Sequence, residues 1–194
     1  MSSLAQAKTL GEIGSILMLL TLIPYAGGAI RLVGLVLVLV SVKYISDALA
    51  DKSIFKNMLI SVILAIVGLI IGVIFAAAVF FSFYRGFTGP FEPSIFMHPR
   101  FFTFVTAFFL AIIPIWIFFI ISAVFLKKSY DTIASKLNIS MFRTSALLYL
   151  VGAVLVIVLV GFIIIFIAEI LQAVAFFSMP EQMPQPSQPA VQPV

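Results

Sequence analysis

Three long apolar runs restrict the folds open to this chain more than any other feature of its sequence. Residues 58–83, 104–126 and 147–168 contain few polar side chains and no charged one. A helix needs about 20 apolar residues to cross the hydrocarbon core of a bilayer, which is about 30 Å thick. We therefore expect membrane-spanning helices at 58–83, at 104–126 and at 147–177, the last extended past its apolar run.

The first fifty residues hold two shorter apolar runs, 13–23 and 32–42, on either side of a Pro-Tyr-Ala-Gly-Gly turn that begins at Pro24. Extended through their polar flanks, these runs form two spans at 4–23 and 29–48. Unextended, each run reaches only about 16 Å, which fits a re-entrant hairpin. Both alternatives return the chain to the face from which it entered.

Composition agrees with a membrane protein. Hydrophobic residues make up 63% of the chain and charged residues 9%, against about 45–50% and about 25% in soluble domains. The expected fold is therefore an all-α, polytopic transmembrane helix bundle of about five segments over residues 1–178. Residues 179–194 are rich in proline and glutamine, which predicts a disordered tail.

The distribution of cations predicts an orientation. With the N-terminus inside, the inner connections hold eight of the eleven Lys and Arg residues, and the outer ones hold three. Basic residues favour the cytoplasmic side of a membrane, so we expect a cytoplasmic N-terminus and, after five segments, an extracellular C-terminal tail in the cell membrane. The inner set is Lys8, Lys43, Lys52, Lys56, Lys127, Lys128, Lys136 and Arg143; the outer set is Arg31, Arg85 and Arg100.

Small residues mark the faces on which the helices are expected to pack. Helices in a bilayer associate through close contact at small side chains, because lipid tails are as apolar as leucine. The candidates are Gly11, Gly14, Gly34, Gly68 and Gly72, the last two forming a GxxxG pattern. Contacts within one chain are favoured over a homo-oligomer seam, which remains the alternative.

The two inner connections resemble each other in composition, with Tyr44 and Lys56 bounding one and Tyr130 and Arg143 the other. A parallel repeat of residues 29–83 and 104–168 and chance similarity are both compatible with this pattern. We expect each connection to form a short amphipathic helix whose cations lie near anionic lipid headgroups at the inner face.

Ionisable residues inside a membrane are costly and therefore attract attention as functional candidates. Glu12 lies within the first apolar segment, one turn after Lys8, which could pair with it. Glu169 follows the last apolar run, where Arg31 or another outer arginine could neutralise it. A structural or interfacial ion pair is the favoured interpretation for both glutamates, and a proton or cation relay is the alternative.

Groups that would support catalysis are scarce. The chain has no cysteine and one histidine, His98, so thiolate chemistry and a histidine-pair metal site are excluded. We expect no cofactor, no metal, no catalytic residue and no nucleic-acid partner.

Several glycine and juxtamembrane positions together are similar to those of an archaeal family of predicted integral-membrane proteins, the domain of unknown function 996. The matching stretches are Gly11–Ser15, Pro24, Lys43–Asp47, Met141–Thr144 with Gly152 and Gly161, and Ala175–Pro180. The resemblance implies a multi-pass membrane protein and transfers no catalytic residue.

The sequence therefore predicts an uncharacterised, non-enzymatic membrane protein that acts through helix packing, lipid or partner contacts. A small oligomeric transporter or channel for a solute or ion is the alternative, since so few polar residues could line a wet path only in several copies. An intramembrane enzyme is the least supported class.

Overall fold

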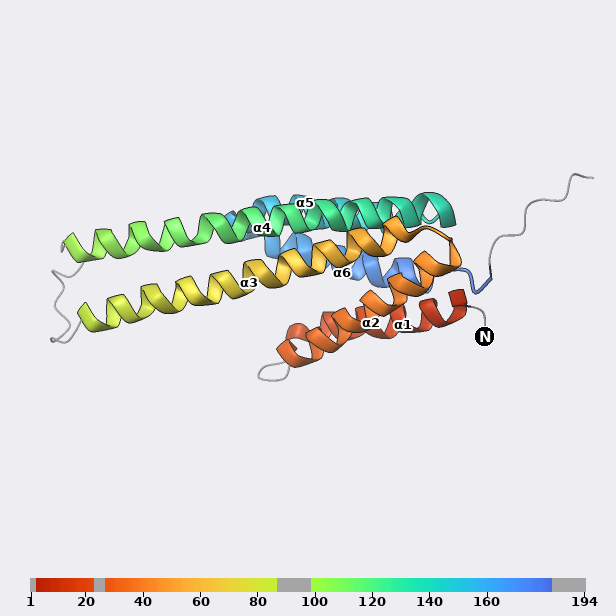
Figure 1. The fold of residues 1–194 in the computed structure, drawn as a ribbon, viewed down its shortest axis with the longest axis horizontal. Helices are drawn as coiled ribbons and strands as arrows, with labels where there is room; N and C mark the ends of the chain where they lie inside the picture. Colours follow the sequence, from red (N-terminus) through yellow and green to blue (C-terminus); the bar gives the residue numbers. More distant parts are fainter. Residues whose placement is uncertain (1–2, 23–26, 87–98, 183–194) are drawn as a thin grey trace, which may run out of the picture.

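The computed structural model describes residues 3–22, 27–86 and 99–182, and all regular structure in these ranges is helical (Figure 1). The expected all-α class is confirmed. The elements are α1 (Ser3–Leu19), the 3-10 turn η1 (Leu20–Leu22), α2 (Gly27–Ala48), α3 (Lys52–Gly86), α4 (Pro99–Leu137), α5 (Ser140–Leu155), the 3-10 turn η3 (Val156–Val158) and α6 (Val160–Phe177).

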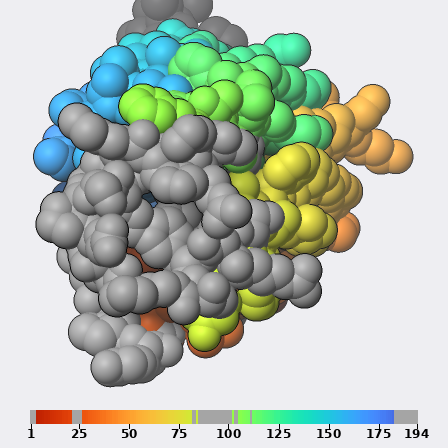
Figure 2. Space-filling model, turned by 90° about the vertical axis from the view of Figure 1, so that its left-hand side faces the viewer, coloured from red at the N-terminus to blue at the C-terminus, as the bar shows by residue number. Residues whose placement is uncertain are grey.

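The helices form three antiparallel hairpins, α1–α2, α3–α4 and α5–α6. Each helix contacts the next along the chain, and α1 also contacts α6, so the six helices close into a ring. Figure 2, viewed from the far end of the α3–α4 hairpin, shows α3 (yellow) beside α4 (green) and the α5–α6 hairpin (blue) on the other side of α4, which contacts it through α5.

The middle hairpin is much longer than the other two. α3 has 35 residues and α4 has 39, whereas α1 and α5 have 17 and 16. All three hairpins begin at one end of the bundle, here called the shared end, where both connections 49–51 and 138–139 lie (Figure 1). The α1–α2 and α5–α6 hairpins stop about halfway along α3 and α4.

The buried core lies toward the shared end. Three fully buried rings form its centre, with Phe142 of α5 edge-on to Tyr130 of α4 at 5.3 Å and to Phe176 of α6 at 5.1 Å between ring centroids. Edge-to-face pairs of this kind contribute about 0.5–1.5 kcal/mol beyond the burial of their area. These rings join α4, α5 and α6 where all six helices are present.

The segment expected as one span at 147–177 is two helices, which corrects that prediction. Leu159 has φ 64° in the left-handed region, a conformation that costs a residue with a Cβ about 1–2 kcal/mol. The chain reverses there, and Gly152 and Gly161 let the two helices approach, because a Cβ on Gly152 would lie 3.0 Å from the Gly161 carbonyl oxygen. The 31 residues of one segment would have been about 46 Å long, well beyond a bilayer core of about 30 Å.

Five helices are long and apolar enough to cross a membrane, as judged by length and composition in the described residues. They are not the five predicted segments, because α5 and α6 count separately and α1, at 17 residues, is not among them. The five ranges are Gly27–Ala48, Lys52–Phe81, Val105–Leu137, Ser140–Val158 and Val160–Phe177.

The described parts of both chain ends lie at the shared end. Lys8 Nζ lies 3.9 Å from Glu181 Oε1, and Gly11 packs against Phe176. The extra reversal at Leu159 makes the number of helices even, so the chain returns to the end of the bundle at which it begins, whereas five segments implied opposite ends. The predicted disorder of the tail concerns residues that, from 183 onward, lie outside the described ranges.

The two connections at the shared end are tight turns and not amphipathic helices lying on a surface. Residues 130–137 continue α4, and each turn contains one residue with positive φ, Ala50 at 50° and Asn138 at 56°. The expectation of separate interfacial helices is wrong because both long helices carry their helical pattern through the basic region to the turn.

Candidate functional site

The strongest candidate site is an ion pair that joins the two short hairpins. Arg31, in the first turns of α2, places Nη2 2.5 Å from Glu169 Oε1, in the middle of α6. The Glu169 side chain is 4% exposed and that of Arg31 is 38% exposed. Glu169 is therefore held as a buried carboxylate whose charge is offset by one guanidinium from the neighbouring hairpin.

Polar side chains from both hairpins surround this pair. Arg31 Nη1 donates to Thr21 Oγ1 at 3.2 Å, which ties the guanidinium to η1. One turn after Glu169, the buried amide of Gln172 donates to the thioether of Met18 at 3.9 Å. The guanidinium is thus fixed on one side by α1–α2 and on the other by α6.

Tyr149 of α5 adds a hydroxyl that has no hydrogen-bond partner within residues 3–22, 27–86 and 99–182. Its oxygen is buried and makes no hydrogen bond to any described residue, and its ring lies within electrostatic reach of both Glu169 and Arg31. A buried hydroxyl normally finds a partner, because leaving one unpaired costs about 1–3 kcal/mol. The cluster Arg31, Glu169, Gln172, Thr21 and Tyr149, here called the inter-hairpin cluster, is therefore not fully satisfied by its own members.

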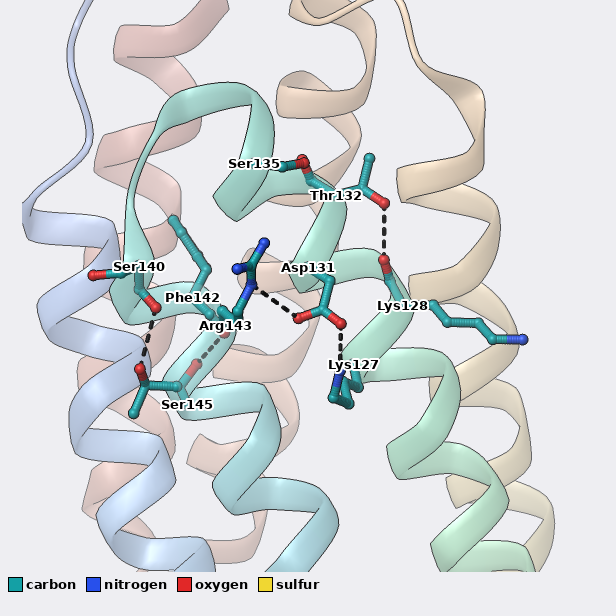
Figure 3. Close-up of polar contacts among 10 residues, drawn as sticks. Lys127, Lys128, Asp131, Thr132, Ser135, Ser140, Phe142, Arg143 and Ser145 are labelled. Atoms are coloured by element: carbon teal, nitrogen blue, oxygen red, sulfur yellow. Dashed lines mark hydrogen bonds and ion pairs between the residues drawn. The ribbon is translucent and has the colours of Figure 1, made fainter.

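A second polar cluster lies at the shared end (Figure 3). Asp131 of α4 bonds Lys127 one turn earlier, and its other oxygen lies 3.8 Å from Arg143 Nε of α5. In the same region Lys136 Nζ lies 2.8 Å from Asp51 Oδ2 in the α2–α3 connection. These pairs link neighbouring hairpins at their polar ends.

The environment of Asp51 favours its charged form. The hydrogen bond from Lys136, followed by bonds from the hydroxyl and backbone N–H of Ser53, lowers the pKa of Asp51 from 3.8 to about 2. Asp51 therefore stays ionised at any physiological pH. Together the contacts describe a structural anchor for the α2–α3 turn.

The structure places all five glycines singled out from the sequence at contacts between helices of the same chain. Gly14 and Gly34 face each other, with an added Cβ on Gly34 only 2.6 Å from the Gly14 carbonyl oxygen. Gly68 and Gly72 of α3 face Phe118 and Ile115 of α4, and Gly11 faces α6.

The structure places the three ionisable candidates in different environments. Arg31 and Glu169 are paired, in agreement with the interpretation that an outer arginine neutralises Glu169. Glu12 is half-buried and is not brought to either of them, and among the described residues no cation lies within ion-pair distance of it. Lys8 lies near Glu181 instead, so the pair that Lys8 could form with Glu12 is not present in the described structure.

Sequence reasoning missed Gln172, Tyr149 and Thr21. The position of Gln172, three residues after Glu169, was a usable signal, because residues three apart lie on the same helix face. Tyr149 could not be found this way, since only the reversal at Leu159 brings α5 beside α6. No group of three or more metal-binding side chains occurs in the part of the chain that the structure describes.

Comparison with known proteins places the chain in a family but gives no activity. Residues 30–170 match the family model described as protein of unknown function (DUF996). The chain is also similar to the uncharacterized protein MJ1644 of Methanocaldococcus jannaschii, with 36% identity over 181 residues that cover 93% of this chain and 95% of that protein. No solved structure matches. The chain therefore belongs to the DUF996 family of proteins of unknown function.

Proposed function

We propose that this protein is a multi-pass protein of the cell membrane that acts without catalysis, through helix packing and contacts with lipid or protein partners. The observation that carries the proposal is the exposure of large apolar side chains along every helix of the bundle. Leu69 of α3 is 63% exposed, Leu110 of α4 is 64% exposed and Ile163 of α6 is 64% exposed. Such a surface is stable against acyl chains and would aggregate in water.

The charges support a cytoplasmic shared end. The eight cations expected on the inner side belong to the helix ends and turns of the shared end, and the positive-inside rule places that end in the cytoplasm. Both described chain ends then lie on the cytoplasmic side, and the connection between α3 and α4 is on the outside. This topology replaces the extracellular tail expected from five segments.

Anionic lipid headgroups are the proposed ligands of the exposed cations at the shared end. Lys52, Lys56 and Lys128 are exposed, and each basic residue near an anionic leaflet contributes about 1 kcal/mol of attraction. Lys127, in contrast, is engaged by Asp131. Replacing Lys52 and Lys56 by Gln should reduce the thermal stabilisation that anionic lipid gives, whereas an unchanged response would remove headgroups from the proposal.

Membrane insertion and topology can be tested together, because the chain contains no cysteine. Lys52→Cys, in the exposed turn end, should react with a membrane-impermeant maleimide only after the cytoplasmic face is opened. Leu159→Cys should stay unreactive from both faces in membranes and react in detergent-denatured protein, although Leu159 is 73% exposed in the fold. Release of the wild-type chain by alkaline carbonate would contradict membrane insertion itself.

A small oligomeric transporter or channel is the second candidate, and the inter-hairpin cluster is the observation that favours it. Buried ionisable groups within a bilayer mark proton and cation pathways, and Glu169 is a buried carboxylate in such a position. Proteoliposomes of the full chain should show no ion or proton flux above empty vesicles if the first proposal holds. A flux that Glu169→Gln abolishes, with the variant still folded, would establish the transporter instead.

A further inference from the structure

The cross-section of the bundle changes sharply along its axis. All six helices are present at the shared end, whereas only α3 and α4 continue past the tips of the two short hairpins (Figure 1). Because all three hairpins start at the same end, the asymmetry follows directly from the difference in helix length.

Two contacts fix the depth at which the α5–α6 hairpin ends. The indole N–H of Trp116 in α4 donates to the backbone carbonyls of Ala153 at 3.0 Å and Val154 at 3.2 Å, in the last turn of α5. At the same level, Gly72 of α3 faces Ile115. Residues 99–115 of α4 and 73–86 of α3 thus extend about 25 Å and about 21 Å beyond the level of Ala153 and Val154, at 1.5 Å per residue. The turn at Leu159 lies five residues further on and takes up at most about 8 Å of that length.

The tip of the α5–α6 hairpin has the chemistry of a turn surrounded by acyl chains. Residues 154–165 contain no polar side chain, and the turn residues Val158 and Leu159 are 59% and 73% exposed. The turn satisfies part of its backbone internally, with Leu159 N–H donating to Val156 O at 3.0 Å and Phe162 N–H to Leu159 O at 3.1 Å. A turn reaching water would carry polar residues, and this one carries none.

The helices beyond the tip are equally apolar, so lipid must surround them too. Ile74 and Phe81 of α3 and Phe109 of α4 are 62%, 61% and 57% exposed. If the short hairpins filled the bilayer, these side chains would stand in water, and each would cost about 1.5–3 kcal/mol relative to burial. The hydrocarbon core therefore extends past the tips, and the space above them is filled by acyl chains of the opposite leaflet.

We propose that the protein is a membrane wedge that favours and stabilises curvature, with the shared end on the convex side. The proposal rests on the membrane insertion argued above. Four additional helices, each about 10 Å across, displace roughly 300 Å² more lipid area from the leaflet of the shared end than from the opposite leaflet. A body that is wider in one leaflet lowers its free energy by moving to membrane that bends toward that leaflet.

In this proposal lipid, and not a second copy of this chain, fills the space above the tips. The small-residue face of α3, at Gly68 and Gly72, is already turned toward α4 of the same chain. Most of the side chains exposed there are bulky, such as Val73, Ile74 and Phe81, with Ala76–Ala78 as the small exception, whereas helix association in a bilayer relies on small residues.

The test uses the full-length chain, labelled on its tail and reconstituted into giant vesicles from which thin membrane tubes are pulled. An impermeant quencher separates molecules with the shared end outward from those with it inward. The outward population should be enriched in the tube relative to the flat membrane, increasingly as the tube narrows, and the inward population should be depleted. The reversed orientation is a matched control that needs no mutation.

Equal density in tube and vesicle for both orientations would overturn the wedge. Enrichment of both orientations alike would also overturn it, and would indicate self-association of copies in place of lipid above the tips. Insertion is measured first by flotation and carbonate resistance, so a chain that fails to insert refutes the membrane proposal, whereas a chain that inserts without sorting refutes only the wedge.

Discussion

Removing the guanidinium of Arg31 should destabilise the fold far more than removing an exposed cation. In Arg31→Met, a side chain of similar length keeps the packing of the stem, but Glu169, 4% exposed, loses the charge partner at 2.5 Å. The two hairpins are then joined around an uncompensated carboxylate.

The size of the expected loss in stability follows from the burial of Glu169 and Arg31. Removing one partner of a buried ion pair lowers the free energy of unfolding by about 3–5 kcal/mol. Because Arg31 is 38% exposed, we expect a loss at the lower end of this range, about 3 kcal/mol. Glu169→Gln keeps an acceptor oxygen for Arg31 and exchanges a charged hydrogen bond for a neutral one, so it should cost only about 1 kcal/mol. The double variant should lose clearly less than the sum of the two single losses, because the second change removes a group that is already unpaired.

The assay is reversible unfolding in detergent micelles, followed by far-UV circular dichroism, for the wild type, both single variants and the double variant. Lys43→Met is the matched control, since Lys43 forms an exposed pair with Asp47 one turn away at 3.2 Å, worth about 0.3–0.5 kcal/mol. If Arg31→Met costs no more than this control, or if the two single losses simply add, the inter-hairpin ion pair does not hold the hairpins together.

Three further predictions concern other parts of the bundle. Gly14→Ala should lower the unfolding temperature, because its Cβ would lie 2.8 Å from a backbone oxygen of α2, whereas Gly28→Ala, with nothing within 4 Å, should not; equal effects would contradict the close packing of α1 and α2. Asp51, with its pKa lowered to about 2, should contribute stability above pH 4 that is lost as the pH falls toward 2. In Lys136→Met, the midpoint of the Asp51 carboxyl titration measured by NMR should return toward 3.8. An unchanged midpoint would show that Lys136 is not the cause of the lowered pKa. Fluorescence of Trp116, the one tryptophan in the sequence, should be quenched most by lipids brominated deep in their acyl chains, and strongest quenching near the headgroups would contradict the depth assigned to the α5–α6 tip.

Hydropathy was sufficient for the class of fold and for the positions of most helices. Residues 58–83 and 104–126 lie inside α3 and α4 because long apolar runs have no other stable arrangement in a bilayer. The glycines at 14 and 34 were also recognisable, since small residues permit the close approach that the structure shows.

The reversal at Leu159 could not be read from residue types. No proline or asparagine marks it, and the turn residues Val156–Val158 are as apolar as the helices around them. Gly161, two residues after Leu159, was interpreted as a position within a single helix. Only the excessive length of 147–177 hinted at a break. The direction of α6 and the neighbours of Glu169 both depend on that reversal, so one unrecognised turn accounts for the end of the bundle at which α6 finishes and for the missed Tyr149.

The left-handed turn at Leu159 also bears on how the protein is made. Under the proposed topology, with the shared end in the cytoplasm, α6 brings the chain back to the side on which it is synthesised, so neither end of the chain has to be carried across the membrane. In that topology only the connection between α3 and α4 is translocated, and the short hairpins enter the bilayer from the side on which the ribosome works. During biogenesis a single connection then crosses the membrane. The composition of the tail is not constrained by a need for export.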